Sequence, residues 1–282
     1  MKIGIIGLDS THALHFPCLL AQAAQRAGVE ISYPLACQAH SPNLAISAQR
    51  VERITEQVVA DYGCTLCEAP EELAQACDGL LILSFGLQVK QAMVDRVLPF
   101  GKALFIDKPL APDSIAASKL IQQADHFGTP TFSASALPLH PNFIQFAAEC
   151  QQHQSKKIHL SGPLAKVEGM SARLFYGVHY TEMAAALLED DCLNLQVNES
   201  NSGLHISGEC RNGRKLSIEA RYDDNGPFRL VDQDNHTAYE IPSGSPGLLY
   251  SGLAAAIAAF FIHGKAPIPL KQVQRSLSWL SL

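Results

Sequence analysis

The 282-residue chain has little charge and no excess of basic residues. Only 17% of its residues are charged, and 21 Lys and Arg stand against 27 Asp and Glu, a net charge of -6. This balance argues against nucleic acid or an anionic membrane as a partner, because both attract strongly basic surfaces. With 47% hydrophobic residues, the chain is long enough to bury the core of one large or two medium domains.

Long hydrophobic runs are also missing. The apolar residues near the N-terminus give way to Asp9 without the small-residue cleavage pattern of a signal peptide. The late apolar run from Gly252 to Ile262 is far shorter than the ~18 residues that suggest a membrane span. The sequence therefore predicts a soluble, cytoplasmic protein.

No set of metal ligands is complete. Among the eight cysteines, Cys64 and Cys67 form a Cys-x-x-Cys pair, and Cys37 and His40 have ligand-like spacing, but both pairs lack the companions of a tetrahedral zinc site. The other thiols are scattered, mostly in apolar stretches, where cysteine behaves as a small hydrophobe. We expect no metal, and thiols that stay reduced in the cytosol.

Strands and helices alternate over the first 135 residues. Helix 44–62 is the clearest, because Val51, Ile54 and Val58 recur on one face and Gly63 ends it. The alternation predicts a doubly wound parallel sheet. Strands are expected at 2–8, 30–37, 80–83, 103–106 and 131–135, and helices at 14–27 (with Pro17 in or near the first turn), 44–62, from Pro70, 89–98 and 114–127.

The pattern changes beyond Pro138, where strand-like segments follow one another. Asn212-Gly213 and Asp224-Asn225-Gly226 are typical hairpin turns between them. This texture predicts an α+β domain on a mainly antiparallel sheet, and a boundary at residue 130 gives domains 1–130 and 131–282. Strands are expected at 165–174, 193–198, 204–211, 215–222 and 228–232, and helices at 143–150, 179–188, 248–262 and 270–280.

The apolar strand 103–106 runs directly into Asp107-Lys108-Pro109. In open α/β sheets, ligands bind at the carboxyl ends of the strands. An amine held there with reduced solvation has its pKa lowered toward neutrality and can move protons. The plainer alternative is a solvated lysine in a loop between strand and helix.

The turn after the first strand, Gly7-Leu8-Asp9-Ser10-Thr11-His12, stands where dinucleotide-binding proteins have Gly-x-Gly-x-x-Gly. Gly7 fits the first glycine, whereas Asp9 and His12 occupy the second and third positions. A carboxylate at this place repels phosphate unless it points away, for example to cap the helix through its own side chain or that of Ser10.

These segments and a third one, Phe175-Tyr176-Gly177-Val178-His179-Tyr180-Thr181-Glu182-Met183, stand in the order and spacing of a known family. Over most of its length the chain resembles the glucose–fructose oxidoreductase/inositol dehydrogenase/MocA (Gfo/Idh/MocA) family. The resemblance implies a Rossmann domain followed by an α+β domain whose open sheet often mediates oligomerisation. It also implies an NAD(P)-dependent oxidoreductase that transfers hydride between nicotinamide and a small sugar, polyol or related carbonyl compound.

The resemblance further implies roles for individual residues. Lys108 corresponds to a lysine near the nicotinamide and substrate, and His179 to the usual proton-transfer residue, with Glu182 three residues later on the same helical face. A helix-capping histidine and a solvated acid are the plainer alternatives for the last two. The candidates for cofactor binding are Gly7, Asp9, Ser10, Thr11, His12, Ser84, Phe85, Asp107, Lys108 and Pro109, and the sequence does not choose between NAD and NADP.

Other functions remain open. Phe175 replaces an acid of the family pattern, and together with Asp9 and His12 it favours a non-catalytic sensor that binds a dinucleotide or metabolite. Redox-coupled elimination or hydrolysis on the same scaffold is a third possibility. We expect a small-molecule substrate and, from the alternation in 204–222, a homodimer or higher homo-oligomer formed through the C-terminal sheet.

Overall fold

The computed structural model describes residues 1–188 and 192–282 and divides into two compact units. The first comprises residues 1–134 and 253–270, and the second comprises 135–252 and 271–282. The chain therefore returns to the first unit near its end, which differs from the single boundary expected at residue 130. The return is held by packing, since the ring of Phe260 lies 5.6 Å from that of Phe132.

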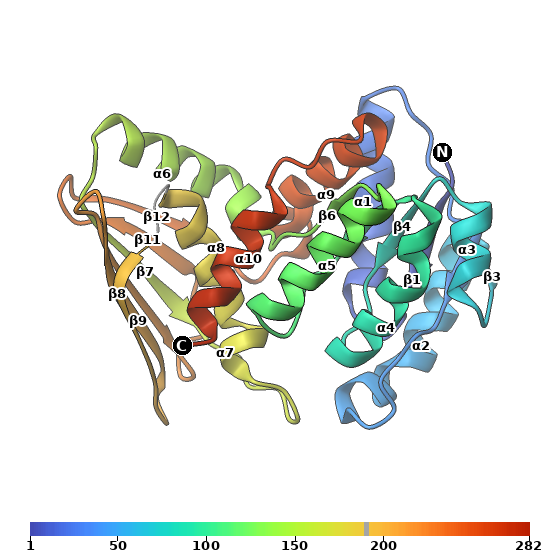
Figure 1. Ribbon diagram of the computed structural model, residues 1–282, viewed down its shortest axis with the longest axis horizontal. Helices are drawn as coiled ribbons and strands as arrows, with labels where there is room; N and C mark the ends of the chain where they lie inside the picture. The colour runs from blue at the N-terminus through green and yellow to red at the C-terminus, as the bar shows by residue number, and fades with distance from the viewer. Residues whose placement is uncertain (189–191) are drawn as a thin grey trace. The chain divides into compact units, whose positions relative to one another are not determined.

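The first unit contains a six-stranded parallel sheet in the order β3-β2-β1-β4-β5-β6 (Figure 1). Every residue of β1 and β4 is buried, as expected when helices cover both faces of a parallel sheet. The predicted doubly wound sheet is confirmed. Its strands are β1 (Ile3–Ile6), β2 (Leu35–Cys37), β3 (Thr65–Leu66), β4 (Gly79–Ile82), β5 (Ala103–Ile106) and β6 (Thr131–Phe132).

The helices of the first unit begin and end close to the expected positions. The helix α5 is capped at its start, where the Asp113 carboxylate accepts a hydrogen bond from the backbone N–H of Ala116. Pro17 is a correction: its helix begins at residue 12, which places the proline in the second turn, where it leaves one backbone bond unmade. The elements are α1 (His12–Arg26), α2 (Ala45–Tyr62), α3 (Pro70–Ala76), α4 (Leu87–Val97), η1 (Leu98–Phe100) and α5 (Ser114–Phe127).

The second unit is built on another six-stranded sheet, in the order β12-β11-β7-β10-β9-β8 (Figure 1). All neighbouring strands are antiparallel except β7 and β10, so the predicted mainly antiparallel sheet is confirmed. The elements are η2 (Leu137–Leu139), α6 (Pro141–Gln152), β7 (Lys157–Pro163), α7 (Ala172–Phe175), α8 (Gly177–Leu187), β8 (Cys192–Glu199), β9 (Gly203–Cys210), β10 (Lys215–Arg221), β11 (Phe228–Asp232) and β12 (Thr237–Ile241).

The strand expected at 165–174 is wrong. The strand is β7, Lys157–Pro163, in which Ile158 and Leu160 alternate inward between less buried neighbours. The pattern was missed because only two large apolar residues mark this strand. Residues 172–175 instead form the short helix α7, capped by the Ser171 hydroxyl, which accepts from Leu174 N–H.

Two helices end the chain, α9 (Pro246–His263) and α10 (Leu270–Leu280). Among the residues that the structure describes, α9 is the one helix long and apolar enough to cross a membrane, and it is longer than the apolar run alone suggested. Six of its side chains, Leu253, Ala254, Ile257, Ala258, Phe260 and Phe261, are buried. A third of the helix is therefore buried against the rest of the protein.

The backbone conformation at Gly7 predicts that the stability of the fold depends on glycine at this position. Its φ is +97°, and an added Cβ would lie 2.1 Å from the backbone nitrogen of Ser84. We expect Gly7→Ala to lower the free energy of unfolding by roughly 2–4 kcal/mol in urea titrations. Gly28→Ala is the matched control, because Gly28 also has a positive φ (+77°) but open space around it. It should cost only about 1 kcal/mol, and equal losses in the two variants would contradict the steric argument.

Candidate functional site

Three turns meet at the carboxyl edge of the first sheet. They follow β1, β4 and β5, which are neighbours in the strand order. Two side chains tie the turns together: Asp9 accepts a hydrogen bond from Phe85 N–H at 2.9 Å, and His12 Nδ1 lies 2.8 Å from Asp107 Oδ2. The structure thus brings together all the residues predicted to bind a cofactor, which are Gly7, Asp9, Ser10, Thr11, His12, Ser84, Phe85, Asp107, Lys108 and Pro109.

Asp107 is a buried carboxylate with cationic neighbours. Burial alone would raise its pKa, but His12, Lys90 and Lys108 more than offset this and lower it to about 2. The His12 ring is held in turn by stacking on Phe16, with ring centres 4.5 Å apart. The acid of the Asp107-Lys108-Pro109 turn therefore serves as an anchor for α1.

The side chain of Lys90 binds the backbone of the same turn. The sequence analysis did not identify this residue. The side chain is 2% exposed, and its Nζ donates to the backbone carbonyls of Asp107 (2.8 Å), Lys108 (3.2 Å) and Pro109 (3.4 Å). Burial lowers the pKa of Lys90 to about 8. The helical spacing could have indicated a buried lysine, because Lys90 lies on the same buried face of α4 as Val94 and Val97.

Asp9 points into the protein rather than capping α1. One carboxylate oxygen accepts from Phe85 N–H, and the other accepts from the Ser47 hydroxyl at 2.6 Å. Burial raises the pKa of Asp9, against the effect of these hydrogen bonds. Ser10 instead binds the start of the helix, since its hydroxyl accepts a hydrogen bond from His12 N–H at 3.3 Å. Ser47, on the buried face of α2, is a second residue that sequence reasoning missed.

Three buried polar atoms at this edge lack a hydrogen-bond partner among the described residues. They are Ser84 Oγ, Asp107 Oδ1 and Ser133 Oγ. These residues follow three adjacent strands, β4, β5 and β6. Buried polar groups are nearly always hydrogen-bonded, and each exception calls for an explanation such as a ligand or water. The edge is therefore a candidate ligand site.

The second unit holds His179 and Glu182, the other predicted catalytic residues, on α8. Ser135 links them: its hydroxyl lies 2.6 Å from His179 Nδ1, and its N–H donates to Glu182 Oε2 at 2.6 Å. Glu182 is only 3% exposed, so it is not a solvated surface acid. The rings of Tyr176 and Phe228 pack around His179, at 5.1 and 6.2 Å between ring centres.

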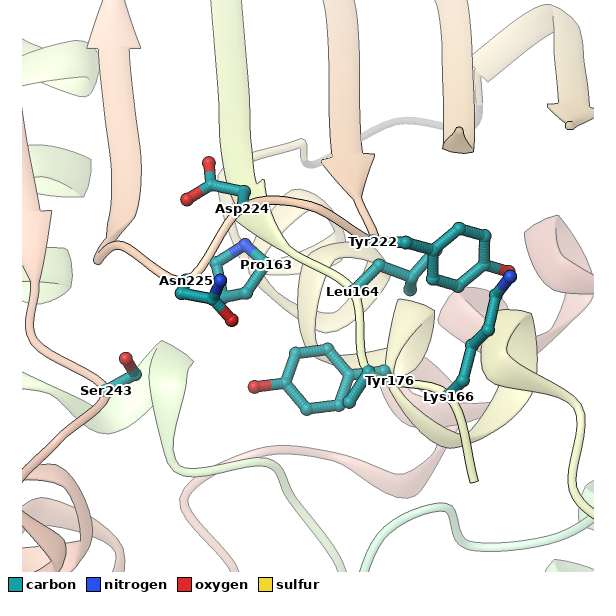
Figure 2. Close-up of a pocket in the computed structure, with 9 residues that line it drawn as sticks. Pro163, Leu164, Lys166, Tyr176, Tyr222, Asp224, Asn225 and Ser243 are labelled. Atoms are coloured by element: carbon teal, nitrogen blue, oxygen red, sulfur yellow. The ribbon is translucent and has the colours of Figure 1, made fainter. Parts of the chain in front are cut away.

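A cavity of about 420 Å³ in the second unit shares Tyr176 with this ring cluster. Figure 2 shows the Lys166 ammonium beside the Tyr222 ring, 3.9 Å from its centre. Burial raises the pKa of Tyr176, which keeps its phenol neutral and able to donate. The lining residues are Pro163, Leu164, Ala165, Lys166, Tyr176, Tyr222, Asp224, Asn225 and Ser243.

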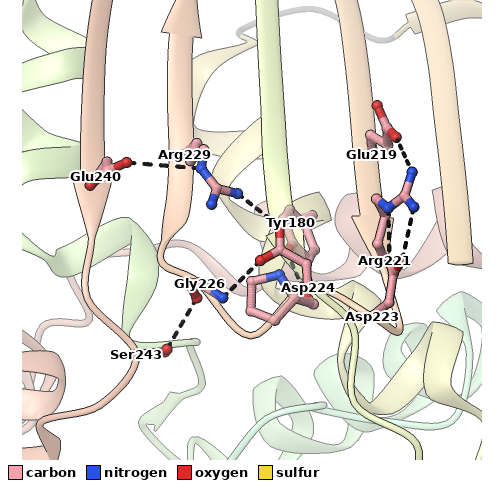
Figure 3. Close-up of polar contacts among 10 residues, drawn as sticks. Tyr180, Glu219, Arg221, Asp223, Asp224, Gly226, Arg229, Glu240 and Ser243 are labelled. Atoms are coloured by element: carbon pink, nitrogen blue, oxygen red, sulfur yellow. Dashed lines mark hydrogen bonds and ion pairs between the residues drawn. The ribbon is translucent and has the colours of Figure 1, made fainter.

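Ion pairs and hydrogen bonds brace the turns beside this cavity. Asp224 accepts from Arg229 Nη1 at 2.7 Å and from Gly226 N–H at 2.7 Å (Figure 3). Ser243 donates to the Gly226 carbonyl from the segment after β12. The 224–226 turn is therefore held from both sides, which fixes one wall of the cavity.

The described residues do not form a cluster of metal ligands. Across residues 1–188 and 192–282, no group of three or more His, Cys, Asp or Glu side chains is placed to hold a metal ion. The candidate chemistry in both units rests on amine, imidazole, carboxylate and hydroxyl groups.

A Rossmann-type parallel sheet joined to an open, mainly antiparallel sheet is the fold of Gfo/Idh/MocA-type dehydrogenases. Among solved structures, myo-inositol dehydrogenase from Lactobacillus casei, determined with NAD(H) and myo-inositol, matches with a TM-score of 0.75 at 11% identity, covering 100% of this chain and 92% of that one. A 3-ketoreductase from Actinomadura kijaniata, determined with NADP, has a TM-score of 0.71 at 16% identity, with 100% and 96% covered.

UDP-N-acetylglucosamine 3-dehydrogenase from Acidithiobacillus ferrooxidans is also similar, with a TM-score of 0.72 at 16% identity and coverage of 100% and 95%. The sequence matches no protein-family model and no curated protein. At these identities the likeness establishes the fold, and the chemistry has to be argued from the residues of this chain.

The lowered pKa of Asp107 predicts a specific dependence of stability on pH. A carboxylate whose pKa falls from its ordinary 3.8 to about 2 on folding stabilises the native state above about pH 4 and loses that contribution between pH 4 and 2. We expect Asp107→Asn to lose about 2 kcal/mol of unfolding free energy at pH 7, with a difference from wild type that shrinks below pH 4. Urea titrations across this range test it.

Asp125→Asn is the control for this experiment, because Asp125 is an exposed residue of α5. It should follow the wild-type curve throughout. A constant difference between Asp107→Asn and wild type from pH 7 to pH 2 would show that the carboxylate charge contributes nothing.

Proposed function

We propose that the protein is an NAD(P)-dependent oxidoreductase, a divergent relative of the Gfo/Idh/MocA enzymes, that acts on a small sugar, polyol or related carbonyl compound. The observation that carries the proposal is the row of unsatisfied buried atoms, Ser84 Oγ, Asp107 Oδ1 and Ser133 Oγ, beside Lys108 at the carboxyl edge of the first sheet. Ligands of doubly wound sheets bind at this edge.

The residues at this edge fit a dinucleotide in two respects. Gly7 keeps the turn after β1 close to the backbone of Ser84, as the first glycine of a dinucleotide-binding turn does. The Asp9 carboxylate, which would repel a phosphate, is turned inward onto Ser47 and Phe85. The amino end of α1 lies next to this turn, and helix amino ends favour anions.

The proposed chemistry divides between the two units. A bound nicotinamide cofactor supplies hydride transfer. In the proposal, Lys108 is the group of the first unit that orients a substrate oxygen, and His179 is the group of the second unit that transfers a proton. Ser135 is the positioning residue, since its hydroxyl can accept a hydrogen bond from His179 Nδ1–H and so leave Nε2 as the nitrogen that takes the proton. Glu182 fixes Ser135 through the backbone N–H.

The cavity beside Tyr176 supports a polyhydroxylated substrate. Its wall combines aromatic rings with amide, hydroxyl, carboxylate and ammonium groups. Such a lining pairs apolar contact with a few orienting hydrogen bonds, as small-molecule sites do. A cytoplasmic location and a homo-oligomer formed through the second sheet stay predictions.

Cofactor binding is the first test of the proposal. We expect NADH or NADPH fluorescence to change saturably on titration with the purified protein, and activity at 340 nm with one member of a sugar and polyol panel. Lys108→Ala should lower kcat by about 10²–10⁴-fold because it removes the group that orients the reacting oxygen. Lys119→Ala, an exposed lysine on α5, is the control.

The outcomes separate the alternatives. Absence of binding by both nucleotides would overturn the oxidoreductase proposal. Saturable binding without turnover of any panel member would favour the sensor alternative instead.

The Ser135–His179 contact predicts an effect on the pH profile. We expect Ser135→Ala to lower kcat about tenfold and to move the acidic limb of the oxidation profile to lower pH, because the imidazolium loses an acceptor. Binding of the nucleotide should be unchanged. Thr181→Val, which removes a buried hydroxyl from the same helix, is the control. Equal profiles for Ser135→Ala and wild type would exclude a positioning role.

A further inference from the structure

Cys192 and Cys210 face each other at the edge of the second sheet. They are directly paired residues of the antiparallel strands β8 and β9, and β8 is one of the two edge strands of this sheet (Figure 1). Their sulfur atoms lie 2.9 Å apart, and both residues are thiols. We propose that this pair is a reversible oxidation site, in which a peroxide converts the two thiols to a cross-strand disulfide that staples β8 to β9.

The backbone geometry already suits the bond. Directly opposed residues of an antiparallel pair have Cα atoms about 4.5 or 5.5 Å apart, and both values fall within the ~4.4–6.8 Å range of disulfides. Opposed residues also place their side chains on the same face of the sheet. No large backbone movement is therefore needed to form the link.

The other thiols are placed differently. The Cys37 sulfur donates toward the Glu68 carbonyl, and the Cys64 sulfur toward the Val58 carbonyl, at 3.8 and 3.9 Å. The sulfur atoms of Cys192 and Cys210, in contrast, lie in direct contact. The Cys-x-x-Cys pair, Cys64 and Cys67, is the competing candidate from sequence spacing alone.

The solvent exposure of the two thiols indicates which one reacts first with the peroxide. Cys192 is partly exposed, whereas Cys210 is 2% exposed. The Cys192 thiolate attacks hydrogen peroxide, the O–O bond breaks, and a sulfenic acid and hydroxide form. The Cys210 thiolate then attacks that sulfur, forms the S–S bond and displaces the second hydroxide. Two thiols lose two electrons to the peroxide, and their two protons complete two molecules of water.

The bond would act on an irregular part of the sheet. The pairing of β8 with β9 shifts register between Leu193 and Gln196, and Asn194 has a φ of +53°. An edge strand has a neighbour on one side only, so a covalent link next to an irregularity adds a constraint that backbone pairing does not supply. We expect the oxidised protein to be more stable than the reduced one, independently of the proposed enzymatic function.

The test uses the full-length protein treated with excess hydrogen peroxide and then quenched. After denaturation and alkylation, two of the eight cysteines should resist alkylation, and peptide mapping should recover a Cys192–Cys210 linked peptide that dithiothreitol removes. The midpoint of thermal unfolding should rise by roughly 5 °C on oxidation and return on reduction. Cys192→Ser and Cys210→Ser should each abolish both effects.

Cys67→Ser is the matched control, because it removes the competing Cys-x-x-Cys pair and should leave the linked peptide and the stability shift intact. The wild-type peptide map decides the matter even if a serine variant folds poorly. Eight alkylated thiols after peroxide, a link between other cysteines, or a bond between two chains would overturn the proposal.

Discussion

The buried ammonium of Lys90 is the constraint on which the candidate site of the first unit depends. Three consecutive carbonyls, from Asp107 to Pro109, converge on its Nζ, and such a group is expensive to bury without these acceptors. These bonds fix the backbone of the turn that carries Asp107 and Lys108. Asp107 reaches His12 and so joins the turn after β5 to the start of α1.

Asp9 shows how a departure from the usual glycine pattern is accommodated. A carboxylate at this position would face a bound phosphate if its side chain extended outward. Here it is fully buried and holds Ser47 on one side and Phe85 on the other. Three segments of the first unit are thereby connected, so the acid that opposes an ordinary phosphate turn has a structural role that explains its presence.

Ser135 has a comparable place in the second unit. It lies three residues after β6, and its hydroxyl and N–H contact His179 and Glu182, which are one turn apart on α8. The burial of Glu182 and the rings around His179 argue that α8 is organised around these polar groups rather than around solvent. The cavity beside Tyr176 then has a rigid wall, since Arg229 and Ser243 brace its neighbouring turn.

Local patterns in the sequence determined much of this protein. The spacing of apolar residues and the residues that end each element predict the helices 44–62 and 114–127, the strand 103–106 and the alternation that defines a doubly wound sheet. Lys108 was predicted from its place in the turn after an apolar strand, and His179 from the resemblance of its segment to a known family. Tertiary structure alone decided the rest. The partners of Lys90, Ser47 and Ser135, the return of 253–270 to the first unit, and the meeting of Cys192 with Cys210 join residues remote in the chain. Periodicity reports which face of an element is buried but not which distant group will meet it there.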